Sequence, residues 1–229
     1  MFVNPAEVLL KDKANNPILR RFRDVFPTRL LEDFKSWLSQ RNNKEVAWDS
    51  TMNPYRLSTW LVAPPCTCTY TYGGKTWEPA ESWPKILDVI TKRTEQALQP
   101  GPYFNAAVLN AYMGGQGAVA MHTDDEYLFD AATYPATIAS LSIGETRDFE
   151  VQDVVTGTLH TFAIQSGDLV TMEGLFQKSH KHAVPKSKAA RGIRYNLTLR
   201  RIVNHERHCS CFSYTPSTTP SSLSETPVE

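Results

Sequence analysis

The 229-residue sequence contains 24 Lys plus Arg against 24 Asp plus Glu, and 41% of its residues are hydrophobic. This composition excludes a chain that is disordered throughout and predicts one sizeable globular domain. The balanced charge excludes a general attraction to polyanions, so binding to nucleic acid would need a local basic patch. No apolar run has the roughly 18 residues of a membrane span, and the charged N-terminal stretch does not resemble a signal peptide. We therefore expect a soluble, intracellular protein without a membrane partner.

Two amphipathic helices are predicted ahead of the core. Apolar residues recur at helical spacing over residues 30–38 and again over residues 86–98, after which Pro100 ends the pattern. The expected segments are an N-terminal extension of uncertain order (1–25), a helical segment (26–102), a β core (103–204) and a C-terminal tail (205–229). We expect the tail to be largely disordered because Ser, Thr, Pro and acidic residues dominate it.

The second half of the chain is expected to form strands. Short runs rich in apolar residues are separated by Gly and Asp, which is typical of strands joined by turns. The predicted strands cover residues 106–112, 137–144, 148–153, 159–165, 167–173 and 194–203. Strands at this spacing after helices favour an α+β fold that is mainly β, with a sandwich or jelly roll and the helices outside.

Four polar side chains share one face of the last predicted strand, and its other face is apolar. They are Arg194, Asn196, Thr198 and Arg200. One interpretation is a solvated surface. The alternative is an interior that binds a dianion, because arginine binds carboxylates through two parallel hydrogen bonds and keeps its charge. Asn110 and Tyr112 form a similar but weaker pair on an earlier strand.

Histidines and a carboxylate have the spacing of a metal site. His122 and Asp124 lie on one side of an extended segment, so both can reach one ion. A third ligand would come from His180 or His182, about 60 residues later. Two His and one carboxylate with open positions form the facial triad of non-haem Fe(II) oxygenases. Zinc fits the ligand types too, but the arginine strand favours iron with a dicarboxylate cosubstrate.

Five motifs resemble, in order and spacing, the AlkB family of Fe(II)- and 2-oxoglutarate-dependent dioxygenases. They are NAYMGGQGAVAMHTDDE, ASLSIGETRDFE, GDLVTMEG, HAVP and RYNLTLR, and the resemblance covers about residues 50–203. It implies a double-stranded β-helix (jelly roll) core with flanking N-terminal helices. It also implies iron bound by His122, Asp124 and His182, since His182 stands directly before the AVP stretch.

The same resemblance implies a cosubstrate site and a reaction. The residues implied to bind 2-oxoglutarate are Asn110, Tyr112, Arg194, Asn196 and Arg200. Arg194 would hold the distal carboxylate, and Arg200 would lie near the end that chelates iron. The family's chemistry uses O2 and 2-oxoglutarate, with ascorbate as reductant in vitro, to oxidise an N-linked methyl group, and it releases succinate and formaldehyde.

The residues after Asp124 resemble those of the family's eukaryotic repair-type members, which act on 1-methyladenine and 3-methylcytosine. Asp125 and Glu126 complete the sequence HTDDE, and a carboxylate there can accept a hydrogen bond from a flipped base. The alternative is a pair of solvated loop acids. Tyr70 and Tyr72 lie in a stretch of the 26–102 segment that resembles the family's nucleotide-recognition lid, although aromatic residues are also ordinary core residues.

A basic patch is predicted around His182. Its members are Lys178, Lys181, Lys186, Lys188 and Arg191. Lys186 and Lys188 are expected to meet phosphates, and a solvated face is the alternative. The expected partner is alkylated DNA or RNA. We expect a monomer in the nucleus, the cytoplasm or both, acting in DNA repair or RNA modification.

Three functions fit these residues. The first is an oxidative demethylase of N-alkylated nucleobases, and the second is an AlkB-like dioxygenase that hydroxylates or demethylates a protein or small molecule. The third is a reader of methylated nucleic acid without turnover, which is disfavoured because every predicted iron and 2-oxoglutarate position is present.

A further group of cysteines and histidines flanks the core. Its members are Cys66, Cys68, His205, His208, Cys209 and Cys211. They would bind zinc if the fold brought them together. Free thiols are the favoured interpretation, because Cys-x-Cys is tighter than the usual zinc-ligand spacing and thiols stay reduced inside cells.

Overall fold

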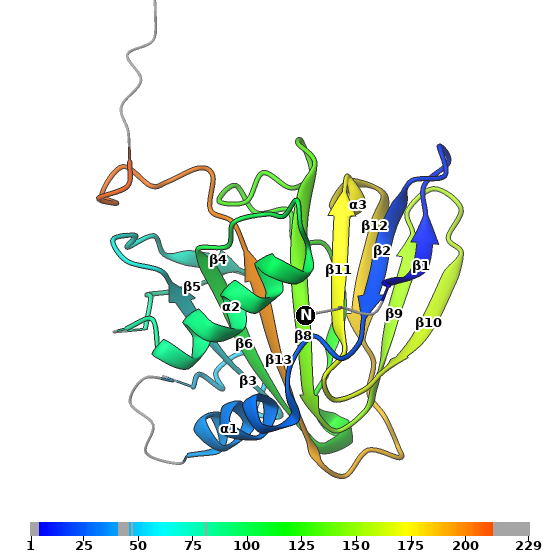
Figure 1. Cartoon of the computed structure of the whole chain (residues 1–229), viewed down its shortest axis with the longest axis horizontal. Helices are drawn as coiled ribbons and strands as arrows, with labels where there is room; N and C mark the ends of the chain where they lie inside the picture. Colours follow the sequence, from blue (N-terminus) through cyan, green and yellow to red (C-terminus); the bar gives the residue numbers. More distant parts are fainter. Residues whose placement is uncertain (1–4, 41–45, 47, 81, 213–229) are drawn as a thin grey trace, which may run out of the picture.

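The computed structural model describes residues 5–40, 46, 48–80 and 82–212. Its core has two antiparallel sheets (Figure 1). The larger sheet contains, in spatial order, β1 (Glu7–Lys11), β2 (Pro17–Phe22), β11 (Leu169–Gly174), β8 (Ala136–Gly144), β13 (Ile193–Arg200), β6 (Ala106–Met113) and β3 (Arg56–Val62). The smaller sheet contains β10 (Leu159–Ile164), β9 (Arg147–Asp153), β12 (His180–Val184) and β7 (Val119–His122). The predicted mainly β jelly-roll core is confirmed.

Two helices cover the outer face of the larger sheet. α1 (Thr28–Ser39) and α2 (Lys85–Ala97) match the predicted helices, and both lie on the same side of the sheet in Figure 1. Phe34 of α1 and Leu87 of α2 are fully buried against the apolar side of β13, which includes Leu197 and Leu199. Burial of such side chains stabilises the fold by about 1.5–3 kcal/mol each. This packing turns the polar side of β13 toward the interior between the sheets.

Short elements complete the described chain. They are the hairpin of β4 (Tyr70–Tyr72) and β5 (Lys75–Trp77), the 3-10 turn η1 (Gly114–Gln116) and the helix α3 (Phe176–Ser179). The interior between the sheets is lined by apolar residues from both, among them Ile138, Phe149 and Met172. None of the helices in the described residues combines the length and apolar character that a bilayer span requires.

The N-terminal segment differs from the expected extension, because β1 and β2 add two strands to the edge of the larger sheet, where β2 pairs with β11. Ion pairs neutralise two of the basic residues of β2. Arg20 lies 2.7 Å from Glu173, and Arg21 lies 2.7 Å from Glu7. At the other end, residues 205–212 fold back onto the β3–β4 loop, while residues 213–229, the rest of the predicted tail, lie outside the described residues.

Arg147 joins the loops at one end of the two-sheet core. Its guanidinium donates to the carbonyl oxygens of Gly114 (3.0 Å), Gly117 (2.8 Å) and Pro185. The first two carbonyls lie between β6 and β7, and the third follows β12. Because the side chain is only 2% exposed, these bonds are shielded from water. Arg147 therefore fixes the spacing between the two strands that carry His122 and His182.

We expect Arg147→Met to lower the free energy of unfolding by about 2–4 kcal/mol, because it leaves shielded carbonyls without donors. Urea denaturation followed by circular dichroism measures this change. The control is Arg191→Met at an exposed position, where the guanidinium bonds only to nearby carbonyls. A variant as stable as this control would contradict the assigned role of Arg147.

Candidate active site

His122, Asp124 and His182 meet at one end of the smaller sheet. His122 ends β7 and pairs directly with His182 of β12, so the two rings lie 4.2 Å apart between centroids. The Asp124 oxygens lie 3.7 Å from Nε2 of His122 and 4.0 Å from Nε2 of His182. One ligand atom from each residue falls within 4.8 Å of the others, which fits a common metal ion.

The environment orients His122 and keeps His182 and Asp124 in the forms that bind metal. Nδ1 of His122 lies 2.8 Å from the carbonyl oxygen of Ala120, which orients the ring, and Nε2 lies 3.7 Å from Asp124. Burial, and then the neighbouring His122, lower the pKa of His182 to about 3, so its ring is neutral. Burial opposes ionisation of Asp124, but the charge of Arg200 outweighs it and lowers the carboxyl pKa to about 2.

Two buried arginines of β13 face the same interior. Arg194 is 3% exposed and Arg200 is 5% exposed, so the solvated-surface interpretation of this strand is wrong. Arg200 donates from Nη2 to Asp124 at 2.7 Å, and Arg194 donates from Nη2 to Ser142 at 2.7 Å. Nε and Nη1 of both arginines have no hydrogen-bond partner among the described residues. Buried guanidinium N–H groups without partners are costly, and a dicarboxylate would satisfy them.

The remaining predicted cosubstrate residues line the same cavity. Its lining includes Asn110, Tyr112, His182, Arg194, Asn196 and Arg200. The Arg194 guanidinium lies over the Tyr112 ring at 5.1 Å from its centroid. Asn196 donates to Ser140 at 2.7 Å and to a backbone carbonyl at 3.1 Å, which fixes its amide. The donor set therefore fits 2-oxoglutarate beside an iron ion.

A second, more open cleft reaches the metal-binding residues from the β4–β5 hairpin. Its aromatic lining comes from Trp60, Tyr70, Tyr72 and Trp77. The residues that it shares with the first cavity are Arg56, Asn110, His122, Asp124 and Arg200. A substrate group placed in this cleft would lie beside the metal-binding residues.

The four predicted base-binding residues have different environments: Tyr70 bonds to Glu126, Tyr72 lies beside His122, and Asp125 is exposed. Tyr70 is buried, stacks on Trp60 at 4.9 Å and donates its hydroxyl to Glu126 at 2.7 Å. Burial, and then the charge of Asp124, raise the pKa of Glu126 to about 7. Tyr72 is half-buried, and its ring meets His122 edge-on at 5.8 Å. Asp125 is exposed to solvent, and neither Asp125 nor Glu126 belongs to the lining of the cleft.

The predicted basic patch is exposed but divided. Lys178 lies on α3, whereas Lys186 and Lys188 lie in the loop between β12 and β13, at the opposite end of β12 (Figure 1). All three side chains are exposed. The structure therefore places Lys186 and Lys188 at one end of the metal-bearing strand, outside the lining of both cavities.

Two supporting residues escaped sequence reasoning. The side chain of Gln177 is buried and accepts a hydrogen bond from the backbone N–H of Asp124 at 2.9 Å. It therefore holds the segment that carries this carboxylate in place. Arg147 contributes the loop contacts described above. Gln177 stands outside the motifs quoted above, so no sequence signal was available for it. Arg147 lies within the motif ASLSIGETRDFE, but nothing in that motif indicates which loop carbonyls its side chain reaches. His180, the alternative third ligand, instead bonds Ser179 and lies 3.8 Å from Asp153.

Comparisons with known proteins agree with this geometry. The model of the 2OG-Fe(II) oxygenase superfamily matches residues 19–200. The chain is 31% identical over 183 residues to human alpha-ketoglutarate-dependent dioxygenase alkB homolog 3, covering 72% of this chain and 61% of that protein. It is 31% identical over 150 residues to DNA oxidative demethylase ALKBH2 from Arabidopsis thaliana, covering 56% of this chain and 45% of that protein.

The fold is also found among solved structures. The structure of OsALKBH1 aligns with a TM-score of 0.60 at 16% identity, over 86% of this chain and 100% of that chain. The chain spans about 60% of the length of the alkB homolog 3 proteins it matches. The family match, the metal-binding triad and the buried arginines lead to one conclusion: the chain belongs to the 2OG-Fe(II) oxygenase superfamily, and within it to the AlkB family.

Proposed function

We propose that this chain is an oxidative demethylase of N-methylated nucleobases in DNA or RNA. The observation that carries the proposal is the pair of adjoining cavities, which share His122, Asp124 and Arg200. One is polar and suits 2-oxoglutarate, and the other is aromatic and suits a flat base. Relatives named as an alpha-ketoglutarate-dependent dioxygenase and as a DNA oxidative demethylase support the same reaction class.

The chain's own residues bind, orient and exclude water. His122, Asp124 and His182 would hold Fe(II) on one face and leave its other positions for the cosubstrate and O2. Arg194 would bind the distal carboxylate of 2-oxoglutarate. Bound iron supplies an oxidation in which O2 gives one oxygen atom to succinate as CO2 leaves and the other to the methyl carbon, whose hydroxylated product releases formaldehyde.

The cleft suits a base that is flipped out of the nucleic-acid base stack. Tyr72 presents a half-buried ring next to His122, and base–aromatic stacking contributes about 1–3 kcal/mol per base. Glu126 lies behind Tyr70, outside the lining of the cleft, and its buried Oε2 has no partner among the described residues. This oxygen would accept a hydrogen bond from the exocyclic amine of a base that reaches it. We assign Tyr70 to support of this carboxylate, because its ring is covered by Trp60. Lys186 and Lys188 would contact phosphates outside the cleft.

The proposal includes a role in DNA repair or RNA modification by a monomer in the nucleus, the cytoplasm or both. A dioxygenase acting on a protein or small molecule is the second candidate, and the same cosubstrate cavity supports it. The aromatic cleft favours the nucleobase.

Mass spectrometry of short DNA and RNA oligonucleotides carrying 1-methyladenine, 3-methylcytosine or N6-methyladenine tests the proposal. With iron, ascorbate and 2-oxoglutarate, the full chain should remove one methyl group from at least one substrate, and Asp124→Ala should remove none. Succinate without any demethylated oligonucleotide would favour the second candidate. Absence of succinate with every candidate substrate would overturn the dioxygenase proposal itself.

His182→Gln is expected to lower 2-oxoglutarate turnover by about 100-fold or more, because it removes an iron ligand. The control is His180→Gln on the same strand, which should keep most of the turnover. Succinate formation at saturating 2-oxoglutarate measures both. Equal loss in the two variants would contradict the choice of His182 over His180.

Arg194→Met is expected to raise the KM for 2-oxoglutarate about 10- to 100-fold, because a charge-assisted pair of hydrogen bonds is lost. Arg201→Met, at an exposed position next to the end of β13, is the control. Isothermal titration of the iron site should show unchanged metal affinity in both variants. An unchanged KM in Arg194→Met would remove this residue from the cosubstrate site.

Tyr72→Ala is expected to raise the KM for a methylated oligonucleotide about 5- to 100-fold by loss of stacking. The KM for 2-oxoglutarate should stay the same, because Tyr72 lines only the aromatic cleft. Tyr134→Ala serves as the control, since that ring is 65% exposed elsewhere. Equal oligonucleotide KM values in the two variants would exclude a stacking role.

A further inference from the structure

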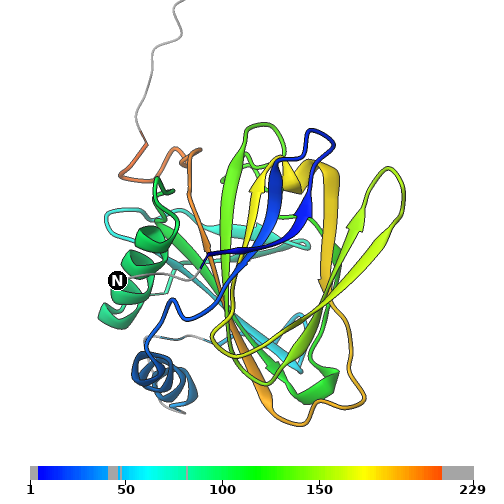
Figure 2. The ribbon, with the colours of Figure 1, turned by 45° about the vertical axis from the view of Figure 1, so that its right-hand side comes forward.

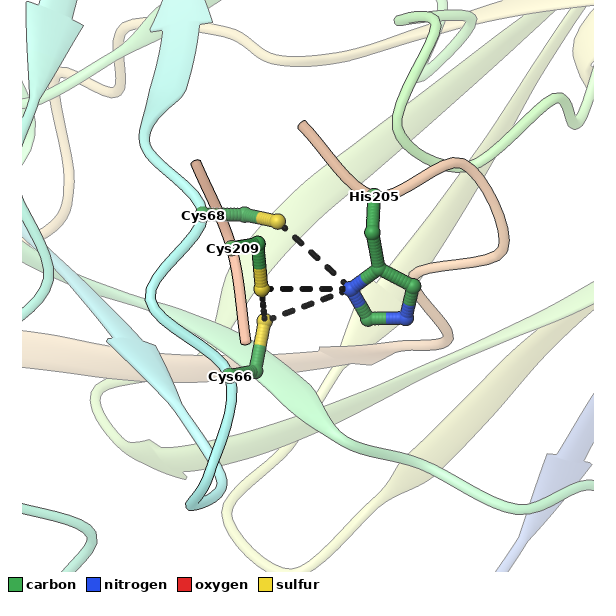
Figure 3. Close-up of side chains that lie close together, drawn as sticks. All are labelled: Cys66, Cys68, His205 and Cys209. Atoms are coloured by element: carbon green, nitrogen blue, oxygen red, sulfur yellow. Dashed lines mark hydrogen bonds between the residues drawn. The ribbon is translucent and has the colours of Figure 1, made fainter. Parts of the chain in front are cut away.

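A second cluster of metal-binding side chains lies where the β3–β4 loop meets the segment after β13. Cys66 and Cys68 come from the loop, and His205 and Cys209 come from the C-terminal segment (Figure 3). The three sulfur atoms and Nδ1 of His205 point toward one another and lie within 4.8 Å. None of these residues belongs to the candidate active site.

Four of the six separations among the ligand atoms match those around a tetrahedral zinc ion. Nδ1 of His205 lies 3.7 Å from the sulfur of Cys66 and 3.6 Å from the sulfurs of Cys68 and Cys209. The sulfurs of Cys66 and Cys209 are 3.6 Å apart. Zinc–sulfur distances of about 2.3 Å and zinc–nitrogen distances of about 2.0–2.1 Å place tetrahedral ligand atoms about 3.5–3.8 Å apart.

Hydrogen bonding among the four side chains cannot explain this convergence. An imidazole Nδ1 carries either one proton or one lone pair, so it satisfies one of the three thiols that approach it. The other two thiols would crowd the same nitrogen without a bond. A metal ion at the centre would satisfy all four ligand atoms at once.

The surroundings suit thiolate ligands. Cys66, Cys68 and Cys209 are at most 6% exposed. Two sulfurs accept backbone N–H groups at 3.4 Å, Cys209 from Thr67 and Cys68 from Glu206. Such outer hydrogen bonds hold metal ligands in place and stabilise their negative charge.

We propose that Cys66, Cys68, His205 and Cys209 form a structural Zn²⁺ site. Four protein ligands close the coordination sphere, which is typical of structural rather than catalytic zinc. Three sulfurs and one nitrogen also favour zinc over magnesium or calcium. Each thiol releases its proton to solvent as the ion binds. The proposal is independent of the proposed demethylase function.

The site would fix the β4–β5 hairpin against the C-terminal segment. Glu206 accepts two hydrogen bonds from Thr69, at 2.7 and 2.9 Å, between the zinc ligand Cys68 and Tyr70. The carbonyl of Cys68 also accepts the indole N–H of Trp60 at 2.9 Å. The ion therefore holds the loop that leads directly into the aromatic cleft.

Elemental analysis by mass spectrometry, on full chain purified without an affinity tag, tests the site. The measurement uses the background variant Asp124→Ala/His182→Ala, which lacks the iron site. Zinc bound at the iron site therefore cannot contribute to the measured content. This variant should keep about one zinc ion per chain, and X-ray absorption should show three sulfurs at about 2.3 Å and one nitrogen at about 2.0–2.1 Å.

The matched variants are Cys68→Ser and Cys211→Ser in this background. Zinc should be lost from Cys68→Ser and kept by Cys211→Ser, because Cys211 lies outside the four-residue cluster. Three results would overturn the proposal. They are a folded background protein without zinc, zinc coordinated only by nitrogen and oxygen atoms, and a Cys66–Cys209 disulfide in place of the metal. If Cys68→Ser does not fold, the absorption spectrum of the background variant decides the question.

Discussion

The buried contact between Arg200 and Asp124 is the interaction on which the rest of the site depends. It joins the larger sheet, through the end of β13, to the carboxylate that follows β7 of the smaller sheet, at 2.7 Å. Burial would raise the pKa of an isolated Asp124, so the carboxylate needs this guanidinium to stay ionised before metal binds. The contact also brings the cosubstrate strand beside the metal ligands, because both partners line the two cavities.

The two sheets contribute different groups to the proposed reaction. The smaller sheet aligns His122 with His182 through a direct pair across β7 and β12, and Arg147 fixes the loops at the ends of these strands. The larger sheet presents one polar face of β13 inward, because α1 and α2 cover its apolar face (Figure 2). Helix packing on the outside therefore determines which side chains can reach the cosubstrate inside.

Local periodicity in the sequence was sufficient to predict the polar face of β13 and the metal-binding residues. Alternation in a strand was enough to group Arg194 with Arg200. The spacing of His122 and Asp124, together with a histidine about 60 residues later, was enough to expect a metal site. Burial of single residues was not predictable, since Tyr70 and Tyr72 share a motif but only Tyr70 is covered by Trp60. The convergence of Cys66 and Cys68 with Cys209 depends on chain folding over 141 or more residues, so the Cys-x-Cys spacing alone could not indicate it.

In the proposed reaction, a single iron-binding site couples the polar cavity to the aromatic cleft. Succinate and formaldehyde should be measured in the same reaction, with the full chain, iron, ascorbate, 2-oxoglutarate and a short oligonucleotide carrying 1-methyladenine or 3-methylcytosine. If the coupling holds, a methylated oligonucleotide yields equal amounts of the two products, and its unmethylated counterpart yields no formaldehyde. Succinate formed without formaldehyde on every methylated oligonucleotide would contradict it.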